Sequence, residues 1–338
     1  MPKWNWTTRS VAMVAAVLLT TASLAGTLQL SNIQQSAAPG FTVAPDTVTA
    51  DGNFALWSNG SVNAPFMRPG EGFTMEWADG VQLGGILIEN VYPASYEITV
   101  NFDGGQYVDT CTVGSYELST FIDFSAFASF ANVRSVQVAV KGGDFTNVTV
   151  LAGGILTNQS AAANVHMIKS VAGDILSGSN TDSIIDGDFW SSWIAPADQE
   201  TTWVGIATAG NTFDADGIRV IAGYYGQGNV AWQGYAVQVT YDGSEWVTLL
   251  DNDGNVFRGI MDPDMIVDHG QQINWIDFGQ TLTGLMGIRL YGDGETGTIA
   301  NATGVSEVFA YTWAPTVPEP ATMILLALGG LAMLRRRK

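Results

Sequence analysis

The residues best suited to ligand binding lie in a glycine-rich segment, residues 223–233. This segment holds three aromatic and two amide side chains: Tyr224, Tyr225, Trp232, Gln227 and Asn229. Aromatic faces can stack on the C–H edges of sugar rings, while amide groups can hydrogen-bond sugar hydroxyls. A second segment, residues 251–274, adds Arg258 as a candidate contact. The pattern predicts a carbohydrate-binding loop, and the alternative is that these aromatic rings cap a hydrophobic core.

Residue patterns of the common catalytic classes are absent from the sequence. The chain contains no Gly-x-Ser-x-Gly or His-Glu-x-x-His motif and no Cys/His cluster. Its histidines are His166 and His269, and Cys111 is its only cysteine, so no intrachain disulfide can form. Cys111 lies in a strand-like stretch, which favours a buried structural thiol. Acidic residues are numerous enough for a two-carboxylate glycosidase, but the sequence favours a binding protein over an enzyme.

The charge distribution excludes one class of partner. The chain has a formal net charge of −19, and six of its 13 Lys and Arg residues lie at the two ends. Between the ends, seven basic residues stand against 31 acidic ones. Such a surface repels phosphate backbones, since it has few cations to replace their counterions. We therefore expect no nucleic-acid partner.

Two stretches of the chain resemble each other in length and pattern. Residues 95–104 and 234–243 both alternate apolar and polar side chains, the mark of a strand with one buried face. Both end in Asp-Gly, which predicts a tight hairpin. The match extends to Gly85–Ile88 with Gly217–Val220, to Val136–Val138 with Ile288–Leu290, and to Asn147–Val150 with Glu307–Ala310.

This internal repeat predicts an all-β fold with two domains in tandem. We expect β-sandwiches over residues 40–157 and 164–313, joined by the polar and alanine-rich linker 158–163. No helical periodicity persists between the two ends of the chain. A body of this size can be stabilised by apolar burial alone.

The second repeat carries a recognisable order of motifs. It runs from Asp186-Gly187-Asp188-Phe189 through Gly217–Val220 and Gly287–Leu290 to Gly304–Val308. That order resembles the F5/8 type C (discoidin-like) domains of the galactose-binding-domain superfamily, which include the family 32 carbohydrate-binding modules. The resemblance implies a jelly-roll β-sandwich for the second domain, and the repeat extends that expectation to the first.

The resemblance also implies a structural calcium ion in the second domain. By position in the motif, the candidate ligands are Asp186, Asp188, Ser191 and Glu307. Carboxylate and hydroxyl oxygens suit Ca²⁺, which takes six to eight oxygen ligands. The alternative is that Asp186 belongs to an ordinary turn and Glu307 is a solvated charge. In the first repeat Asn147 stands at the Glu position, so we expect no calcium there.

The sequence predicts a targeting segment at each end of the chain. Residues 1–25 combine Lys3 and Arg9 with an apolar run and a Ser-Leu-Ala end, which predicts a secretory signal peptide. The alternative is an uncleaved membrane anchor. Residues 318–338 combine Pro318-Glu319-Pro320, an apolar stretch and a basic end, and resemble the PEP-CTERM sorting signal. That resemblance implies an exosortase partner, transient contact of the C-terminal helix with the inner membrane, and removal of the tail. An ordinary tail anchor is the alternative.

These observations predict an exported, non-catalytic protein of the cell surface or extracellular matrix that binds polysaccharide or a cell-surface glycan. The alternative is a structural matrix or adhesion protein that binds protein partners without recognising glycans.

Overall fold

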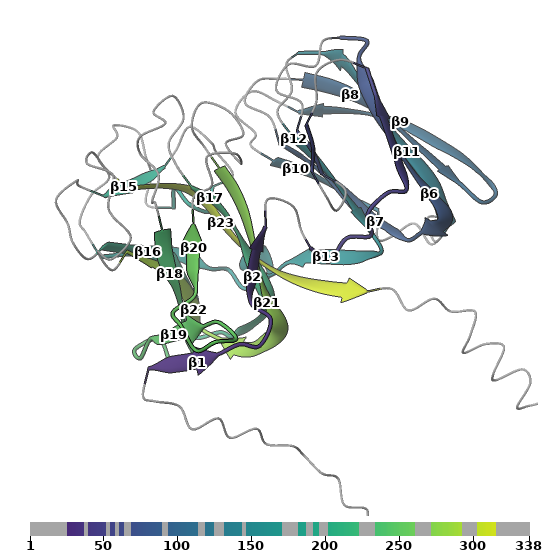
Figure 1. Ribbon diagram of the computed structural model, residues 1–338. Helices are drawn as coiled ribbons and strands as arrows, with labels where there is room; N and C mark the ends of the chain where they lie inside the picture. The colour runs from purple at the N-terminus through teal and green to yellow at the C-terminus, as the bar shows by residue number, and fades with distance from the viewer. Residues whose placement is uncertain are drawn as a thin grey trace, which may run out of the picture.

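The computed structural model describes the strands of the two sandwiches and some of their connections. The described residues are 26–36, 40–51, 55–57, 61–63, 69–89, 94–113, 119–124, 132–143, 147–170, 182–186, 192–195, 202–222, 234–260, 272–292 and 303–315. Nearly all of these residues lie in strands and turns, with one short helix, α1 (Gln159–Ala162). The expected all-β fold with two sandwiches is confirmed, and Figure 1 shows them side by side.

The first sandwich pairs two antiparallel sheets. One sheet has the order β3 (Thr47–Ala50), β6 (Gly72–Val81), β11 (Val133–Gly142), β8 (Ala94–Phe102) and β9 (Gly105–Val113). The other has the order β10 (Ser119–Asp123), β7 (Leu83–Glu89), β12 (Asn147–Ala152), β5 (Ser61–Asn63) and β4 (Ala55–Trp57). Their inward side chains, including Tyr96, Ile98 and Val136, form one buried core.

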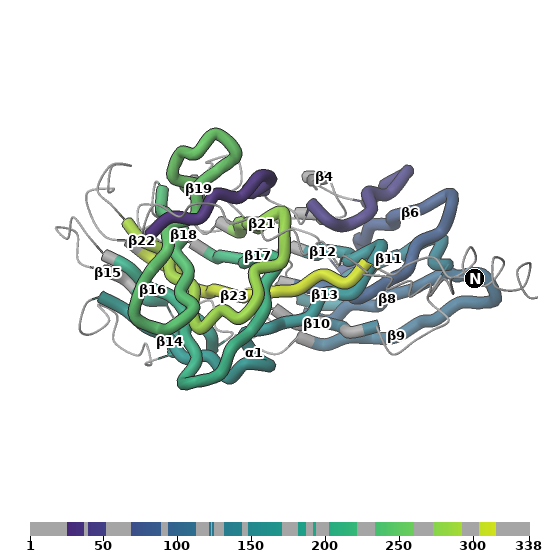
Figure 2. Tube along the Cα trace, turned by 90° about the horizontal axis from the view of Figure 1, so that it is seen from below, coloured from purple at the N-terminus to yellow at the C-terminus, as the bar shows by residue number. Residues whose placement is uncertain are grey.

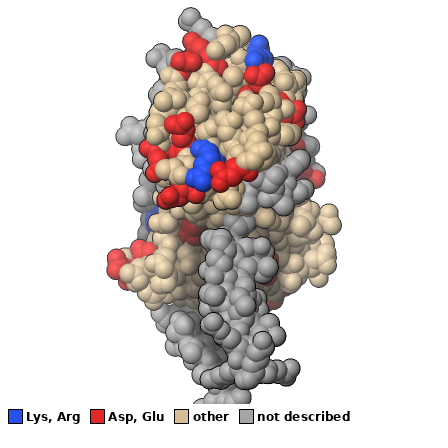
Figure 3. Space-filling model, turned by 90° about the vertical axis from the view of Figure 1, so that its right-hand side faces the viewer, with Lys and Arg blue, Asp and Glu red and all other residues tan. Residues whose placement is uncertain are grey.

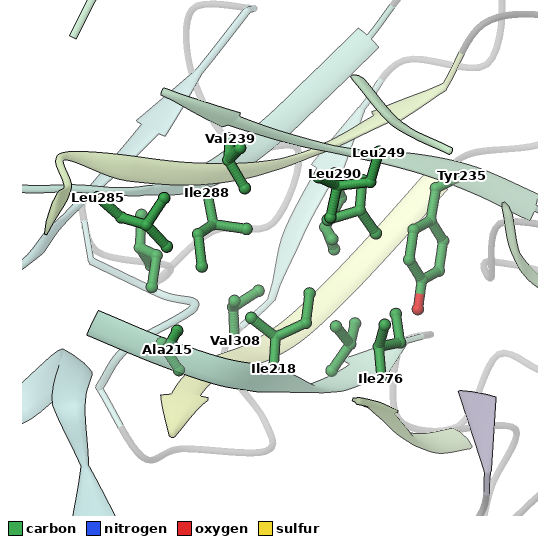
Figure 4. Close-up of a cluster of buried hydrophobic side chains, with 14 of the residues drawn as sticks. Ala215, Ile218, Tyr235, Val239, Leu249, Ile276, Leu285, Ile288, Leu290 and Val308 are labelled. Carbon is green, nitrogen blue, oxygen red and sulfur yellow. The ribbon is translucent and has the colours of Figure 1, made fainter. Parts of the chain in front are cut away.

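The second sandwich also pairs two sheets. The outer sheet has the order β14 (His166–Lys169), β16 (Thr202–Ala207), β22 (Gly287–Gly292), β18 (Gly234–Thr240), β19 (Val247–Leu250) and β1 (Thr27–Gln29), with β20 (Arg258–Ile260) also on β18. The inner sheet has the order β2 (Gln34–Ser36), β21 (Gln272–Leu285), β17 (Phe213–Ala222), β23 (Thr303–Pro315) and β13 (Gly154–Asn158), with β15 (Trp193–Ala195) also on β23. Figure 4 shows side chains from both sheets meeting in the core.

The two sandwiches repeat each other strand by strand. The sheet order β6-β11-β8-β9 corresponds to β16-β22-β18-β19, and β10-β7-β12 corresponds to β21-β17-β23. The register agrees as well, because Val148 pairs with Ile88 as Val308 pairs with Val220. The segments matched in the sequence therefore occupy equivalent strands.

The two Asp-Gly turns differ. In the first sandwich Phe102 pairs with Gly105, so Asp103-Gly104 forms the expected two-residue hairpin. In the second, residues 241–246 separate β18 from β19, and a tight hairpin was the wrong prediction there. The Asp242 carboxylate accepts hydrogen bonds from the backbone N–H groups of Ser244 and Glu245, both at 2.8 Å, which stabilises a wider turn.

Strands from outside residues 164–313 complete the second sandwich. β1 pairs in parallel with β19, β2 pairs with β21, and β13 pairs with β23, and all three precede residue 164. The expected linker contains α1, which Asn158 caps by accepting a hydrogen bond from Ala161 N at 3.0 Å. The domain ranges 40–157 and 164–313 stay a proposal. A fragment that keeps every strand of the second sandwich must also include β1, β2 and β13.

Aromatic packing joins the two sandwiches. Leu87 and Leu151 of the first sandwich share a buried cluster with Trp275 and Tyr311 of the second. The Phe41 ring lies 5.3 Å from Tyr311 and 4.3 Å from Trp313, centroid to centroid. The cluster covers the face of the inner sheet that points away from its own core. In Figure 2, β13 and β23 run from the second sandwich toward the first.

Candidate functional site

An arginine surrounded by aromatic rings lies on the outward face of the outer sheet. The guanidinium carbon of Arg289 is 4.3 Å from the ring centroid of Trp246, 4.9 Å from that of Trp203 and 5.4 Å from that of Tyr291. The Trp203 and Trp246 rings are 6.5 Å apart and inclined at 35°. All four side chains are partly exposed. We call these four residues the aromatic platform.

Strand alternation explains why these side chains meet. On β22, Ile288 and Leu290 enter the core, so Arg289 and Tyr291 point outward. On β16, Val204 and Ile206 enter the core, and Trp203 points outward opposite Tyr291. Residues directly opposite on one sheet face are in contact distance of each other. Residues 241–246, which we call the Asp242 turn, end at Trp246 and so add the second tryptophan.

A glycine on the neighbouring strand accommodates Arg289. Gly205 pairs with Arg289, and a Cβ atom at Gly205 would lie 2.2 Å from the Ile288 carbonyl oxygen and 2.6 Å from the Arg289 Cα. Such separations are too short for any side chain, so only glycine fits behind the platform.

Arg289 is fixed by an amide rather than a carboxylate. Its Nε donates to Gln238 Oε1 at 2.7 Å, and Gln238 Nε2 donates in turn to Thr248 Oγ1 at 2.9 Å. No Asp or Glu among the described residues forms an ion pair with Arg289. Burial lowers the pKa of Arg289 below its ordinary value. An arginine nonetheless stays protonated at neutral pH, so the platform carries a positive charge.

The first sandwich lacks this arrangement at the equivalent positions. Gln137 stands where Arg289 does, flanked by Thr74 and Thr99, while Gly72 and Ala139 correspond to Trp203 and Tyr291. The cations of that sheet are ion-paired instead, Arg134 with Asp103 at 3.1 Å and Lys141 with Glu97 at 3.0 Å. Figure 3 shows blue cations beside red carboxylates on that side of the molecule. The fold therefore does not require the platform.

Arg258, predicted as a ligand contact, lies beside the platform. It pairs with Ala236, which pairs with Tyr291, which pairs with Trp203. These four positions form one row across the outer sheet, and Arg258 is partly exposed on its outward face. The structure thus brings one predicted contact together with residues that the sequence did not single out.

Two predicted calcium ligands lie on segments that contact each other. Ile184 O accepts a hydrogen bond from Val308 N at 2.8 Å, which places the turn 182–186 against β23. Asp186 is exposed at the end of that turn, and Glu307 precedes Val308. Ile185 and Glu307 also line one shallow hollow of about 230 Å³. No group of three or more His, Cys, Asp or Glu side chains suited to a metal occurs among the described residues.

Glu307 also acts on a buried arginine. Arg219, on β17, lies with its guanidinium carbon 5.7 Å from the Trp275 ring centroid. Burial lowers the pKa of Arg219 to about 10, and the charge of Glu307 opposes that shift. Glu307 therefore has an electrostatic role that does not depend on a metal.

The other predicted site residues lie outside the described residues. These are Asp188 and Ser191, the loop residues Tyr224, Tyr225, Gln227, Asn229 and Trp232, and the triplet Pro318-Glu319-Pro320. Cys111 is described, partly buried on β9 and packed against the first core. Within the described ranges no helix is long and apolar enough to cross a membrane.

Part of the signal for the platform is present in the sequence. The alternation that places Val204, Ile206, Ile288 and Leu290 in the core leaves Trp203 and Arg289 facing outward. An outward tryptophan and an outward arginine on aligned strands are a signal of a binding surface. The sequence alone did not show that β16 and β22 are neighbours.

Comparison with known protein families identifies the C-terminal end. The model of the PEP-CTERM protein-sorting motif matches residues 316–338. Residues 316–338 are a PEP-CTERM sorting signal. This motif implies export and a membrane-anchored C-terminal signal, and it begins directly after β23, which ends at Pro315. No curated protein sequence matches the chain significantly.

Solved structures with similar strand arrangements come from several functional classes. The F5/8 type C domain of a Bacteroides fragilis protein is 16% identical, with a TM-score of 0.36, over 47% of this chain and 96% of that chain. The CBM32-1 and CBM32-2 domains of Clostridium perfringens ZmpB are 9% identical, with a TM-score of 0.33, over 84% and 92%. Allantoicase from Saccharomyces cerevisiae is 12% identical, with a TM-score of 0.32, over 76% and 82%. At this level of similarity, none of them assigns a function to the chain.

Proposed function

We propose that the protein is an exported, non-catalytic carbohydrate-binding protein and that the aromatic platform is its principal sugar contact. The observation that carries the proposal is the group formed by Trp203, Trp246 and Arg289 on an outward sheet face. Partly exposed indole rings offer flat apolar surface to the C–H face of a sugar. The adjacent guanidinium and the Gln238 amide can hydrogen-bond its hydroxyls.

The internal repeat strengthens this proposal. Both sandwiches bury their cores with the same strand order, yet the platform occurs on the second sandwich and not at the equivalent positions of the first. A purely structural cluster would serve both copies equally. We therefore assign ligand binding to the second sandwich and a spacing role to the first.

The platform's composition argues for binding rather than catalysis. Its residues and their hydrogen-bond partners Gln238 and Thr248 include no carboxylate, histidine or cysteine. General acid–base and nucleophilic mechanisms most often use such groups within hydrogen-bond reach of the substrate. The loop residues Tyr224, Tyr225, Gln227, Asn229 and Trp232 are proposed as additional sugar contacts, since the loop leads directly into β18.

Calcium is proposed as a structural ion of the second sandwich, held by Asp186, Asp188, Ser191 and Glu307. The contact between the 182–186 turn and β23 supports this for Asp186 and Glu307. We propose exosortase as the processing partner of the C-terminal signal, and a polysaccharide at the cell surface or in the extracellular matrix as the ligand. Transient inner-membrane contact through the C-terminal segment precedes processing.

A glycan-array screen of the exported protein tests the proposed function. Binding to at least one polysaccharide is expected, and Trp246→Ala should weaken it. Tyr241→Ala is the matched control, because Tyr241 is an exposed aromatic residue of the same sandwich that contacts no platform ring. Absence of glycan binding by the wild-type protein, together with binding to a matrix protein, would favour the structural alternative.

A further inference from the structure

We infer that the platform selects carboxylated sugars, with Arg289 as the residue that recognises the carboxylate. This inference rests on the proposed carbohydrate binding and adds the chemical class of the ligand. It starts from the position of two cations: of the seven basic residues between the two ends of the chain, Arg258 and Arg289 lie in adjacent rows on one sheet face.

The hydrogen-bond pattern of Arg289 leaves its outer edge available. Gln238 occupies Nε, and the two terminal Nη groups make no hydrogen bond to any other described residue. A guanidinium presents its donors in a planar fork that matches the two oxygens of a carboxylate. The pair Nη1 and Nη2 can therefore bind a carboxylate end-on while Nε stays fixed.

The electrostatic setting explains the selectivity. Elsewhere in this acidic protein the described cations Arg134 and Lys141 are neutralised by Asp103 and Glu97, whereas no described carboxylate pairs with Arg289. The three rings exclude water from part of the guanidinium, and a partly desolvated charge interacts more strongly with a counter-charge. A neutral sugar would leave that charge without a counter-ion, while a uronic acid would supply one.

The acidic body does not prevent this contact. Repulsion between the body and a polyanion acts over long distances and is screened beyond about 8 Å at physiological ionic strength. The guanidinium–carboxylate contact is short and partly shielded from solvent, so it is screened less. The ligand expected is therefore a short hexuronate segment, bound with one carboxylate at Arg289 and its sugar ring on Trp203 or Trp246.

The test is calorimetric titration of the exported protein with hexuronate oligosaccharides and with their methyl esters, which keep the ring and remove the charge. The wild type should bind the acid about tenfold more tightly than the ester, the difference expected for one charge-assisted contact. Arg289→Gln should bring this ratio close to one, and Arg289→Lys should give an intermediate ratio because it keeps the charge but loses the fork.

Thermal unfolding of each variant controls for loss of structure, and the ratio of the two affinities is independent of the active fraction of protein. Equal wild-type affinity for acid and ester would overturn the inference, and so would an acid preference that survives in Arg289→Gln. Binding of neutral glycans in either case would leave the proposed function intact. Absence of binding to both the hexuronate acids and their esters would also overturn the inference. Whether the protein binds neutral glycans would then decide the proposed function separately.

Discussion

The guanidinium of Arg289 lies closer to the ring of Trp246 than to the rings of Trp203 and Tyr291, at 4.3 Å against 4.9 and 5.4 Å. Trp246 is supplied by the turn after β18, while the other three residues come from β16 and β22. The platform therefore depends on the conformation of one turn as well as on strand register. Its geometry leads to the following predictions.

Replacing Trp246 by alanine should weaken glycan binding without unfolding the protein. Loss of a stacked aromatic contact is expected to cost about 1–3 kcal/mol of binding free energy. The side chain is partly exposed, so the unfolding midpoint should change little. Titration calorimetry and thermal unfolding of the same variant measure both quantities. Unchanged affinity with a large drop in stability would show that Trp246 is a structural residue.

Trp275→Ala should behave in the opposite way. Trp275 is 2% exposed, and its ring centroid lies 5.4 Å from that of Tyr311 in the cluster between the sandwiches. Removing a buried tryptophan costs about 3–5 kcal/mol of unfolding free energy. Because this cluster lies on the inner sheet, glycan affinity of the folded fraction should stay the same. Chemical denaturation gives the stability change, and a loss of affinity as large as that of Trp246→Ala would place the ligand elsewhere.

Acid should weaken the turn that carries Trp246. Hydrogen bonds from the backbone N–H groups of Ser244 and Glu245 lower the pKa of Asp242 to about 2, from 3.8. A carboxyl group with a lowered pKa in the folded state stabilises the protein above its unfolded pKa, and that contribution disappears as the pH falls from 3.8 through about 2. Asp242→Asn should flatten the pH dependence of unfolding in this range. Identical pH profiles for the wild type and the variant would contradict the assignment.

Calcium should stabilise the second sandwich. An ion that binds only the folded state adds about 2.7 kcal/mol at a hundredfold excess over its Kd. The exported protein should melt at a higher temperature in calcium than in chelator, and Asp186→Ala should remove that difference. Asn147→Ala, at the position in the first repeat that corresponds to Glu307, is the matched control. A wild-type midpoint that does not respond to calcium would reject the site.

The sequence predicted the repeat well because the repeat follows from local patterns. Alternation of apolar residues over 95–102 and 234–240 placed β8 and β18, and the matched segments fell on equivalent strands with the same register. The second Asp-Gly turn was mispredicted because Asp242 accepts two backbone hydrogen bonds and widens the loop. The pairing of β1 and β2 with the second sandwich has no local signal, since their partners β19 and β21 lie far away in the sequence.

The candidate site was less accessible to sequence reasoning. Trp203, Trp246 and Arg289 are separated by long stretches of chain and meet only through the neighbouring positions of β16, β22 and the Asp242 turn. Arg258 was predicted as a ligand contact because it lies in residues 251–274. The structure shows that it shares one row across the outer sheet with Tyr291 and Trp203. Three-dimensional proximity of this kind follows from sheet order, which one sequence does not provide.

The most direct test of the central claim is hydroxyl-radical footprinting of the exported protein with and without the glycan selected on the array. Mass spectrometry then reports the oxidation of each aromatic side chain. If the platform binds sugar, the glycan should protect Trp203, Trp246 and Tyr291, while the exposed residue Tyr241 stays equally reactive. Unchanged oxidation of Trp203 and Trp246, with protection confined to residues 223–233, would contradict the platform and place the ligand on the loop.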